Sequence, residues 1–333
     1  MEKTIEKNNS TGKWITKILF ITLGILLVFY TLVILGMIFW GLLTSLKSDA
    51  DYLGGLGYFG DSNVLGFPRL NKDVVGNSFE YFFKLKNYRI IMSKLEINKT
   101  VTYYPTGSTE KISYTVTNNF YMMLTNTLMY TIGGALIYAF MPALTAYLCA
   151  KYDYKLSRAI VVVYTLMMCM PIVGSLPTEL TFLRDTGLYD SILGNYIQKM
   201  TGSGMYFFVY LAYFKGMSNT YREAAVIDGA GPFKVMTSIY FPLAIKMIST
   251  VFLIQFVSLW NDYQTPLIYL PTWPTLAYGV FYVSTPTQSY DRDLYAIPTQ
   301  ISAPMMLAIP IIIIFIIFKD KLMGDITLGG IKE

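Results

Sequence analysis

The sequence has 333 residues, of which 54% are hydrophobic and only 14% charged, and its mean hydropathy is +0.45. Because a soluble domain carries about 25% charged residues, this composition indicates an integral membrane protein. The chain has no histidine and two cysteines, Cys149 and Cys169, which stand alone in apolar runs. This excludes an ordinary His/Cys zinc site and a paired-cysteine redox motif. The net charge of +5 comes from scattered basic residues and does not indicate a nucleic-acid partner.

Charge-free apolar runs predict six membrane spans, since a span needs about 20 predominantly apolar residues. The first run, residues 18–46, is too long for a signal-peptide core, so we expect a retained anchor. The later spans are expected, in chain order, within residues 121–150, 159–178, 202–217, 243–262 and 294–318. The run at 202–217 is the weakest, and it decides on which side of the membrane the following residues lie.

The distribution of basic residues predicts the orientation of the spans. The connections 151–158 and 218–242 carry basic residues, as the N-terminus does, so the positive-inside rule puts them and both termini in the cytoplasm. The segment between the first two spans is too long for this rule. In chain order the predicted parts are the cytoplasmic N-terminus 1–17, the first span 18–46, an external insert 47–118, a core bundle 119–318 that includes the cytoplasmic loop 218–242, and a cytoplasmic tail 319–333.

A charged, glycine-punctuated stretch, YREAAVIDGAGPFKVMTSIYFP at residues 221–242, separates two apolar runs. Thr220, with Glu223 three residues later, indicates a capping box at a helix N-terminus. Gly229 suits the left-handed turn that ends a helix, and Pro232 suits the first turn of a second helix. The loop is therefore predicted to hold two short helices joined by a tight turn.

The next span is expected to begin at Pro242. The first short helix is expected to expose Ala224 and Ala225, whose small side chains would let another protein approach closely. The alternative is an ordinary surface loop in which Glu223 only caps a helix.

The spacing of these residues resembles the signature loop of permease subunits of ABC importers. The match consists of Glu223-Ala224-Ala225, Gly229, Ile239 and Phe241-Pro242, with Phe241 where leucine is usual. Asp228 and Ala230, on either side of Gly229, resemble the carbohydrate-uptake, maltose-type branch. Four further stretches are similar to that branch: NYRIIMS (87–93), NFYMMLTNTLMYT (119–131), FVSLWNDYQTPLIYL (256–270) and LMGDITLGGIKE (322–333).

This resemblance implies an all-α bundle of the type I ABC importer permease fold in a bacterial cytoplasmic membrane. It implies that the loop 218–242 is a coupling helix that docks on a separate ABC ATPase dimer. The chain has no GxxxxGK[ST] phosphate loop, so ATP and Mg²⁺ would be bound by that partner and not by this chain. The residues implied to contact the ATPase are Glu223, Ala224, Ala225, Asp228, Gly229 and Pro242, with Gly329 and Gly330 of the tail.

The resemblance also implies three other partners. These are a second, homologous permease subunit that completes a heterodimer, an extracytoplasmic solute-binding protein, and a carbohydrate, expected to be an oligosaccharide. Near the end of the fifth span, aromatic and amide side chains suit a sugar path: Trp260, Asn261, Tyr263 and Gln264. Their alternative role is aromatic anchoring at the membrane interface. Glu179, an ionisable residue near the third span, is a further candidate, or a water-exposed structural residue.

Two other classes of protein fit the sequence less well. A secondary transporter driven by an ion gradient would need buried carboxylates or histidines in the middle of its spans, and the charge-free runs contain none. A membrane-embedded enzyme would need paired acids, a Ser/His couple or metal ligands. With no histidine and with acids confined to loops, we expect no catalytic residue and no metal site. An ABC permease for a solute other than a sugar stays open.

The external insert is predicted to form an ordered cap. KTVTYYPTGSTEKISYTVT, residues 99–117, alternates polar and apolar residues on either side of PTGS, which predicts a β-hairpin. The aromatic-rich FEYFFKLKNY, residues 79–88, indicates a helix at the membrane interface. We expect this cap to contact the solute-binding protein. The alternative is a cap that packs only on its own subunit.

Overall fold

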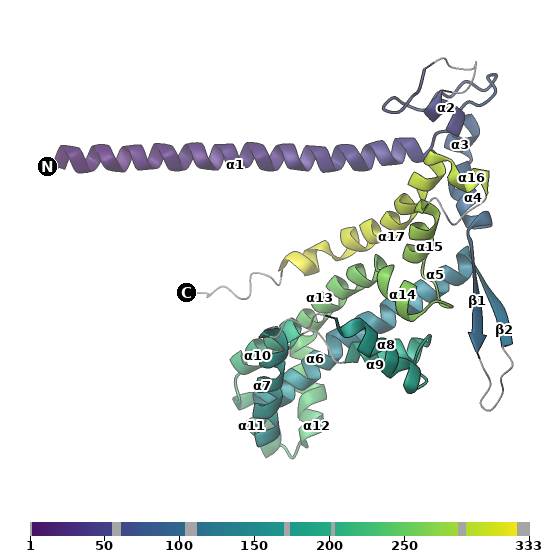
Figure 1. Cartoon of the computed structure of the whole chain (residues 1–333). Helices are drawn as coiled ribbons and strands as arrows, with labels where there is room; N and C mark the ends of the chain where they lie inside the picture. Colours follow the sequence, from purple (N-terminus) through teal and green to yellow (C-terminus); the bar gives the residue numbers. More distant parts are fainter. Residues whose placement is uncertain are drawn as a thin grey trace. The chain divides into compact units, whose positions relative to one another are not determined.

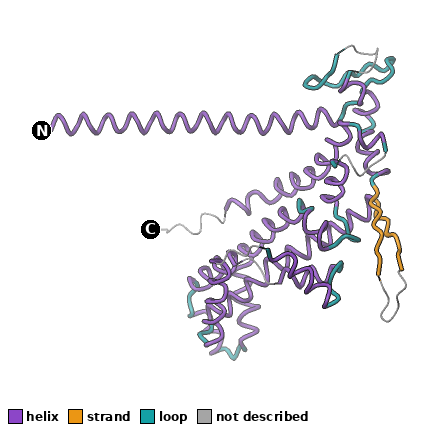
Figure 2. The backbone as a smooth tube through the Cα atoms, viewed as in Figure 1, coloured by secondary structure: helices purple, strands orange, loops and turns teal. Residues whose placement is uncertain are grey.

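The computed structural model describes residues 2–54, 61–103, 112–169, 174–200, 204–285 and 291–324. The chain divides into two compact units. The first comprises residues 1–90 and 295–305, and the second comprises residues 91–294 and 306–333. Among the described residues every regular element except one β-hairpin is helical (Figures 1 and 2), as expected for a membrane bundle.

The first unit is built on one long helix, α1, which runs from Glu2 to Ser45. Its residues Thr16–Ser45 are long and apolar enough to cross a membrane, and their most apolar part is not covered by the rest of the chain. The first predicted span thus coincides with a helix of sufficient length and apolarity. The other helices of this unit are α2 (Asp49–Leu53), α3 (Phe79–Phe83), α4 (Lys86–Lys94), which ends in the second unit, and α17 (Ile297–Gly324), which begins in the first.

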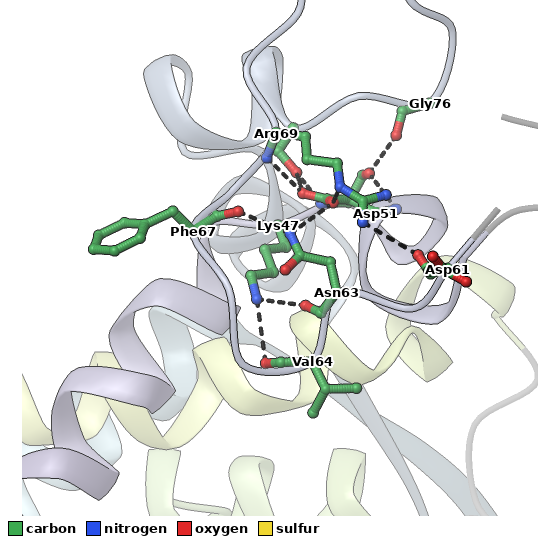
Figure 3. Close-up of polar contacts among 10 residues, drawn as sticks. Lys47, Asp51, Asp61, Asn63, Val64, Phe67, Arg69 and Gly76 are labelled. Atoms are coloured by element: carbon green, nitrogen blue, oxygen red, sulfur yellow. Dashed lines mark hydrogen bonds and ion pairs between the residues drawn. The ribbon is translucent and has the colours of Figure 1, made fainter. Parts of the chain in front are cut away.

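A buried polar network holds the chain that follows α1 (Figure 3). The fully buried Lys47 ammonium donates hydrogen bonds to the main-chain oxygens of Asn63 (2.6 Å) and Val64 (3.2 Å). The fully buried Asp51 carboxylate accepts hydrogen bonds from Asn63 Nδ2 (3.0 Å) and the Arg69 main-chain N–H (2.9 Å), and Arg69 Nε lies 3.7 Å from it. Since buried charges need partners, this network fixes the path of residues 61–69.

The aromatic-rich stretch at residues 79–88 is not one helix. Helix α3 ends at Phe83 and α4 begins at Lys86. Between them Leu85 has a φ of 49°, a left-handed conformation in which a right-handed helix cannot continue. The expected single helix is therefore wrong, and the location of this stretch at the membrane interface stays a prediction.

The second unit holds the remaining elements. In chain order they are β1 (Glu96–Tyr103), β2 (Ile112–Asn119), α5 (Phe120–Leu128), the π-helical turn η1 (Met129–Gly133), α6 (Gly134–Lys151), α7 (Lys155–Cys169), α8 (Ser175–Asp185), α9 (Ile192–Met200), α10 (Gly204–Gly216), α11 (Thr220–Ile227), α12 (Pro232–Val235), the π-helical turn η2 (Met236–Tyr240), α13 (Phe241–Trp260), α14 (Gln264–Tyr269), α15 (Leu276–Ser284) and α16 (Arg292–Tyr295), the last of which ends in the first unit.

The core of the second unit lies where α6 packs against α10 and α13 (Figure 1). Helix α6 contributes Ala139, Ala143 and Ala146, which are fully buried, and small residues let membrane helices approach closely. Aromatic rings fill the remaining space, as where Tyr147 of α6 meets Phe214 of α10 edge-on, with ring centroids 5.6 Å apart. The helices before and after the loop 218–242 thus share one packed core.

Four of the six predicted spans coincide with helices long and apolar enough to cross a membrane. Within the described residues these are Thr16–Ser45, Phe120–Lys151, Pro232–Trp260 and Ile297–Phe318. The third predicted span overlaps α7, which has 15 residues. The fourth predicted span contains α10, which has 13 residues. At 1.5 Å per residue these helices extend about 22 and 20 Å, less than the hydrocarbon core of about 30 Å.

The predicted hairpin is confirmed, and Figure 2 shows its two strands. Strands β1 and β2 pair antiparallel, from Glu96 opposite Asn119 to Tyr103 opposite Ile112. The PTGS tip lies outside the described residues. Strand β2 ends directly at the N-cap of α5, where Asn119 Oδ1 accepts a hydrogen bond from the Met122 N–H (3.0 Å), so the hairpin continues straight into the second span.

Candidate functional site

The loop 218–242 begins with α11, but without the predicted capping box. Thr220 is the first helical residue, and Asn219 before it has φ −74° and ψ −16° and makes no side-chain cap. The Glu223 N–H donates to the main-chain oxygen of Asn219 (3.0 Å), and Ser218 Oγ accepts from the Thr220 N–H (3.2 Å). The prediction was wrong because Asn219 is already helical, whereas an N-cap residue takes an extended backbone.

The left-handed turn predicted at Gly229 is confirmed by its φ of 79°. The Ala230 N–H donates to the Ala225 oxygen (2.8 Å), and the Gly229 N–H donates to the Val226 oxygen (3.0 Å). These two bonds are those of a Schellman motif, which closes a helix by satisfying its last carbonyls. Asp228 is the C-cap residue. The loop therefore reverses direction at a point that its own backbone stabilises.

The second half of the loop continues without a break into the helix of the fifth predicted span. Pro232 opens α12 as predicted, and no new helix begins at Pro242, because Pro232–Trp260 form one helical segment of 29 residues. In η2 the Phe241 N–H donates to the Met236 oxygen, and Pro242, which has no N–H, follows without breaking the helix. Because the segment is continuous, displacement of α12 is transmitted directly along α13.

Helix α11 is attached to the end of the second span through Lys151, the last residue of α6. Lys151 Nζ donates to Asn219 Oδ1 (3.1 Å) at the start of α11. Arg222 Nη1 of α11 donates to the main-chain oxygen of Lys151 (2.9 Å). Lys151 is also largely buried, at 7% exposed, and its ammonium lies 5.0 Å from the centroid of the Tyr240 ring. The loop thus contacts two spans at the same end.

Other residues of the loop form an apolar, exposed surface. Ile227 is 86% exposed, Phe233 is 74% exposed and Val226 is 58% exposed. Val226 and Ile227 line a hollow of about 460 Å³ together with Glu223. Large apolar side chains left open at a loop, with a carboxylate beside them, indicate a surface that another protein covers.

The two alanines of the loop have different environments. Ala224 and Asp228 are exposed, as is Glu223. Ala225 is only 7% exposed and packs in the core of the second unit. The expectation that both alanines face outward was wrong for Ala225, which instead lets α11 lie close to its own core.

The residues predicted to line a sugar path near the end of the fifth span have different environments, and their role in the path stays a prediction. Trp260 is buried, at 3% exposed, and its indole Nε1 donates to the Leu307 main-chain oxygen of α17 (3.1 Å). It joins two spans and is therefore not an interfacial anchor. The Tyr263 ring stacks on Phe281 of α15 at 4.6 Å between centroids. Asn261 and Gln264 are exposed.

Glu179 of α8 is held by two neighbouring helices. Its Oε2 accepts hydrogen bonds from Tyr269 Oη of α14 (2.7 Å) and Gln198 Nε2 of α9 (3.1 Å). Burial, followed by the hydrogen bond to the Glu179 carboxylate and its charge, raises the pKa of the Tyr269 hydroxyl to about 12. Glu179 therefore has a positioning role between α8, α9 and α14.

A buried polar cluster was missed by the sequence reasoning. Lys199 of α9 is 4% exposed, and its Nζ donates to Asn195 Oδ1 (2.7 Å) and to Tyr130 Oη (3.3 Å). Tyr130 Oη in turn donates to Asp262 Oδ2 (2.6 Å). Burial lowers the pKa of Lys199 to about 8, and Asp262 partly offsets this. Asp262 at the end of an apolar run was the available signal, but nothing in the sequence pairs it with Lys199.

No group of three or more His, Cys, Asp or Glu side chains that could hold a metal ion occurs among the described residues. The tail residues Gly329 and Gly330 lie outside them, so their contact with an ATPase stays a prediction.

Comparison with known proteins identifies a family match over more than half of the chain. Residues 142–324 match the model of the family described as binding-protein-dependent transport system inner membrane component. The matched range contains the whole loop 218–242 and the helices α10 and α13 that flank it.

Curated relatives are similar to this chain over somewhat more than half of its length. The probable starch degradation products transport system permease protein AmyC of Thermoanaerobacterium thermosulfurigenes is 28% identical over 217 residues, which cover 62% of this chain and 74% of that protein. The melibiose/raffinose/stachyose import permease protein MelC of Bacillus subtilis is 24% identical over 213 residues, with the same shares.

A solved structure shows the same fold. It is a chain of a bacterial ABC transporter involved in the import of the acidic polysaccharide alginate. Its TM-score is 0.69 at 21% identity, and the match covers 91% of this chain and 96% of that chain. The predicted permease fold is confirmed by this similarity.

Proposed function

This chain belongs to the family of binding-protein-dependent transport system inner membrane components, and we propose that it is the membrane-spanning subunit of an ATP-driven importer for an oligosaccharide. In this role it forms half of the translocation path, and ATP is hydrolysed by a separate subunit. The main observation behind the proposal concerns the loop 218–242. It has an exposed apolar surface and a hydrogen-bonded connection to the spans.

The coupling role of the loop is supported by two features of its construction. Its outer surface offers Ile227 and Phe233, 86% and 74% exposed, to a cleft of the ATPase. Its inner surface is bonded to Lys151 through Arg222 and continues as the helix Pro232–Trp260. Closure of an ATPase pair would therefore displace α6 and α13 and shift the population from inward-facing to outward-facing states.

The remaining partners follow from this mechanism. A second permease subunit completes the path, a dimer of ABC ATPases binds ATP and Mg²⁺, and a solute-binding protein delivers the solute from outside the cell. Both termini and the loop 218–242 then lie in the cytoplasm, in agreement with the positive-inside rule.

A carbohydrate as solute is supported by the relatives, whose names specify starch degradation products and the sugars melibiose, raffinose and stachyose. A proton- or sodium-driven transporter would need a carboxylate in the middle of a span, and the charge-free runs of the sequence contain none. An importer for a non-sugar solute is the alternative, and the uptake experiment below separates the two.

The experiment is to purify the chain with its associated subunits and reconstitute the complex in liposomes with its solute-binding protein. We expect ATP-dependent uptake of a labelled oligosaccharide from a panel of maltotetraose, raffinose and a uronate tetrasaccharide. Uptake that needs an ion gradient instead of ATP, or ATP-dependent uptake only of amino acids or peptides, would contradict the proposal.

A further inference from the structure

A wide groove lies in the second unit, at the end of the second span opposite the loop 218–242. Its volume is about 1220 Å³. Tyr121 and Met129 of that span line it, whereas Lys151 at the other end of the span contacts α11. The other walls are the hairpin β1–β2, the connection between α8 and α9, and Thr272 with Trp273. We name it the hairpin groove.

Aromatic rings from separate parts of the chain meet in the hairpin groove. They are Tyr114 of β2, Tyr121 of α5, Tyr189 after α8, and Trp273 after α14. Tyr121 is 59% exposed, Tyr114 is 51% exposed and Trp273 is 36% exposed, so their rings are open to a ligand. Exposed aromatic rings in a concave surface bind apolar faces of ligands, and a pyranose ring has such a face while its edge carries hydroxyl groups.

The polar residues of the groove are held in place by the main chain. Asn118 Nδ2 donates to the Thr272 oxygen (3.2 Å), and Asn126 Nδ2 donates to the Pro274 oxygen (3.2 Å). Because each bond uses the amide nitrogen, the side-chain oxygen of each asparagine has a fixed position. Such preorganised amides are acceptors for sugar hydroxyls at little entropic cost.

Charged groups complete the rim. Asp190 Oδ2 accepts a hydrogen bond from Thr272 Oγ1 (2.8 Å), and Oδ1 accepts one from the Thr272 N–H (3.0 Å). The Arg184 guanidinium lies over the Tyr189 ring at 4.9 Å. Burial raises the pKa of Asp190, and the bonds from Thr272 oppose this effect. Thr272 donates to both carboxylate oxygens of Asp190. Arg184 is therefore the charged group of the rim that we expect to donate to a hydroxyl or carboxylate of a ligand.

We propose that the hairpin groove is a saccharide-binding site of the permease subunit itself, in which Trp273 and Tyr121 stack on sugar rings and Asn118 and Arg184 bind their polar substituents. The inference deepens the proposed function and rests on it. The groove would hold the oligosaccharide between its release from the solute-binding protein and its entry into the path.

The test measures saccharide binding to the complete transporter in nanodiscs, without the solute-binding protein, by isothermal titration calorimetry. The probe is the member of the panel above that the wild-type complex imports. We expect Trp273→Ala and Tyr121→Ala each to weaken binding about tenfold, as for a central aromatic contact, and Trp273→Phe to recover most of it. Phe182→Ala is the matched control, since Phe182 of α8 is 60% exposed and does not line the groove.

The outcomes separate the two claims. If the probe is imported but binds all variants equally, or does not bind the complex, the groove is not a saccharide site and the proposed function stands. If the variants keep saccharide affinity but lose affinity for the solute-binding protein, the groove is a protein-docking surface and the proposal is overturned. If no saccharide of the panel is imported, the proposed function fails and the inference with it. Thermal unfolding of each variant confirms its folding.

A second inference comes independently from the first unit. The loop at residues 63–67 folds back on the last turns of the span in α1. Trp40 Nε1 donates to the Val64 oxygen (2.9 Å), and Phe67 lies edge-on to Phe39 with ring centroids 6.3 Å apart. Leu65 is 82% exposed and Phe67 is 71% exposed. Because Phe39 and Trp40 lie near the C-terminal end of the candidate span Thr16–Ser45, the loop tip lies beside that end of the helix.

We infer that Leu65 and Phe67 insert into the lipid next to α1, so that this loop is a membrane-interface anchor. The experiment attaches a nitroxide at Leu65→Cys, with Cys149 and Cys169 replaced, in the complete transporter in nanodiscs. Asp73→Cys, at an exposed charged position of the same unit, is the control. We expect the label at 65 to collide with oxygen but not with a nickel chelate, and the label at 73 to show the reverse. Nickel access at 65, or access for neither reagent because protein covers it, would overturn the inference.

Discussion

Arg222 Nη1 of α11 donates a 2.9 Å hydrogen bond to the main-chain oxygen of Lys151, the last residue of α6. A side chain of the exposed loop is thereby attached to the end of a membrane span. Lys151 returns a hydrogen bond to Asn219 Oδ1 (3.1 Å), so the two elements are connected in both directions. These two bonds are the connection through which we expect movement of α11 to reach α6.

Arg222→Ala should weaken this connection. The lost hydrogen bond contributes about 1 kcal/mol, so we expect the chain to fold but to transport several-fold less oligosaccharide per ATP hydrolysed. The measurement compares uptake with ATP hydrolysis in the same proteoliposomes. Arg158→Ala is the control, since its partner Asp153 is equally exposed and such pairs contribute little. An unchanged ratio for Arg222→Ala would show that the bond carries no coupling.

Gly229→Val should uncouple the transporter through backbone strain. The φ of Gly229 is 79°, and a Cβ built there meets no atom within 4 Å. The substitution therefore causes no collision, but it places a β-branched residue in the left-handed region, which costs about 1–2 kcal/mol. We expect ATP hydrolysis to continue while uptake falls.

Gly231→Ala is the matched control for that experiment. Gly231 lies two residues further on, has a φ of −69°, and also has open space where a Cβ would lie. Any side chain is tolerated there, so uptake should remain at the wild-type level. Equal effects of the two substitutions would show that loss of glycine, and not the left-handed turn, is responsible.

Asp51→Ala should destabilise the first unit. Removing this carboxylate leaves the Arg69 N–H without its acceptor, leaves Asn63 Nδ2 with only its bond to the Phe67 oxygen (2.8 Å), and leaves the buried Lys47 without a nearby anion. Breaking a buried charged network costs about 3–5 kcal/mol. We expect residues 61–69 to become sensitive to limited proteolysis in the intact complex, whereas Glu80→Ala, which removes an exposed pair with Lys84, should not change the digestion pattern.

Lys199 makes stability depend on pH. Its pKa is lowered to about 8 in the folded chain against 10.5 ordinarily. Below pH 8 both folded and unfolded chains carry the charge, and the desolvation cost is fully present. Between about pH 8 and 10.5 the unfolded chain binds more protons, so the free energy of unfolding rises with pH by up to about 1.4 kcal/mol per unit. Wild type should therefore gain melting temperature relative to Lys199→Met between pH 8 and 10, and a constant difference would contradict this.

Local signals in the sequence predicted several parts of the structure. The left-handed turn at Gly229, the hairpin, and the long apolar helices depend on residues close together in the chain, and these predictions are confirmed. The predicted capping box failed because the helical backbone of Asn219 is not visible in the spacing of Thr220 and Glu223.

Tertiary contacts explain what the sequence did not reveal. Trp260 suited a sugar path or an interface, but its indole bonds to α17, far along the chain. Lys199 of α9 and Asp262, between α13 and α14, meet through Tyr130 of η1. The break at Leu85 depends on one dihedral angle, for which leucine gives no signal.

The most direct test of the account is site-specific photocrosslinking at Ile227, the most exposed apolar residue of the loop at 86% exposed. A benzophenone side chain is placed at Ile227 or, as control, at Tyr121 at the opposite end of the second span, in the reconstituted transporter. We predict that position 227 crosslinks to a subunit that mass spectrometry identifies as containing a phosphate-binding loop, and that position 121 does not. A crosslink to that ATPase from position 121 and none from position 227 would contradict the assignment of the loop 218–242.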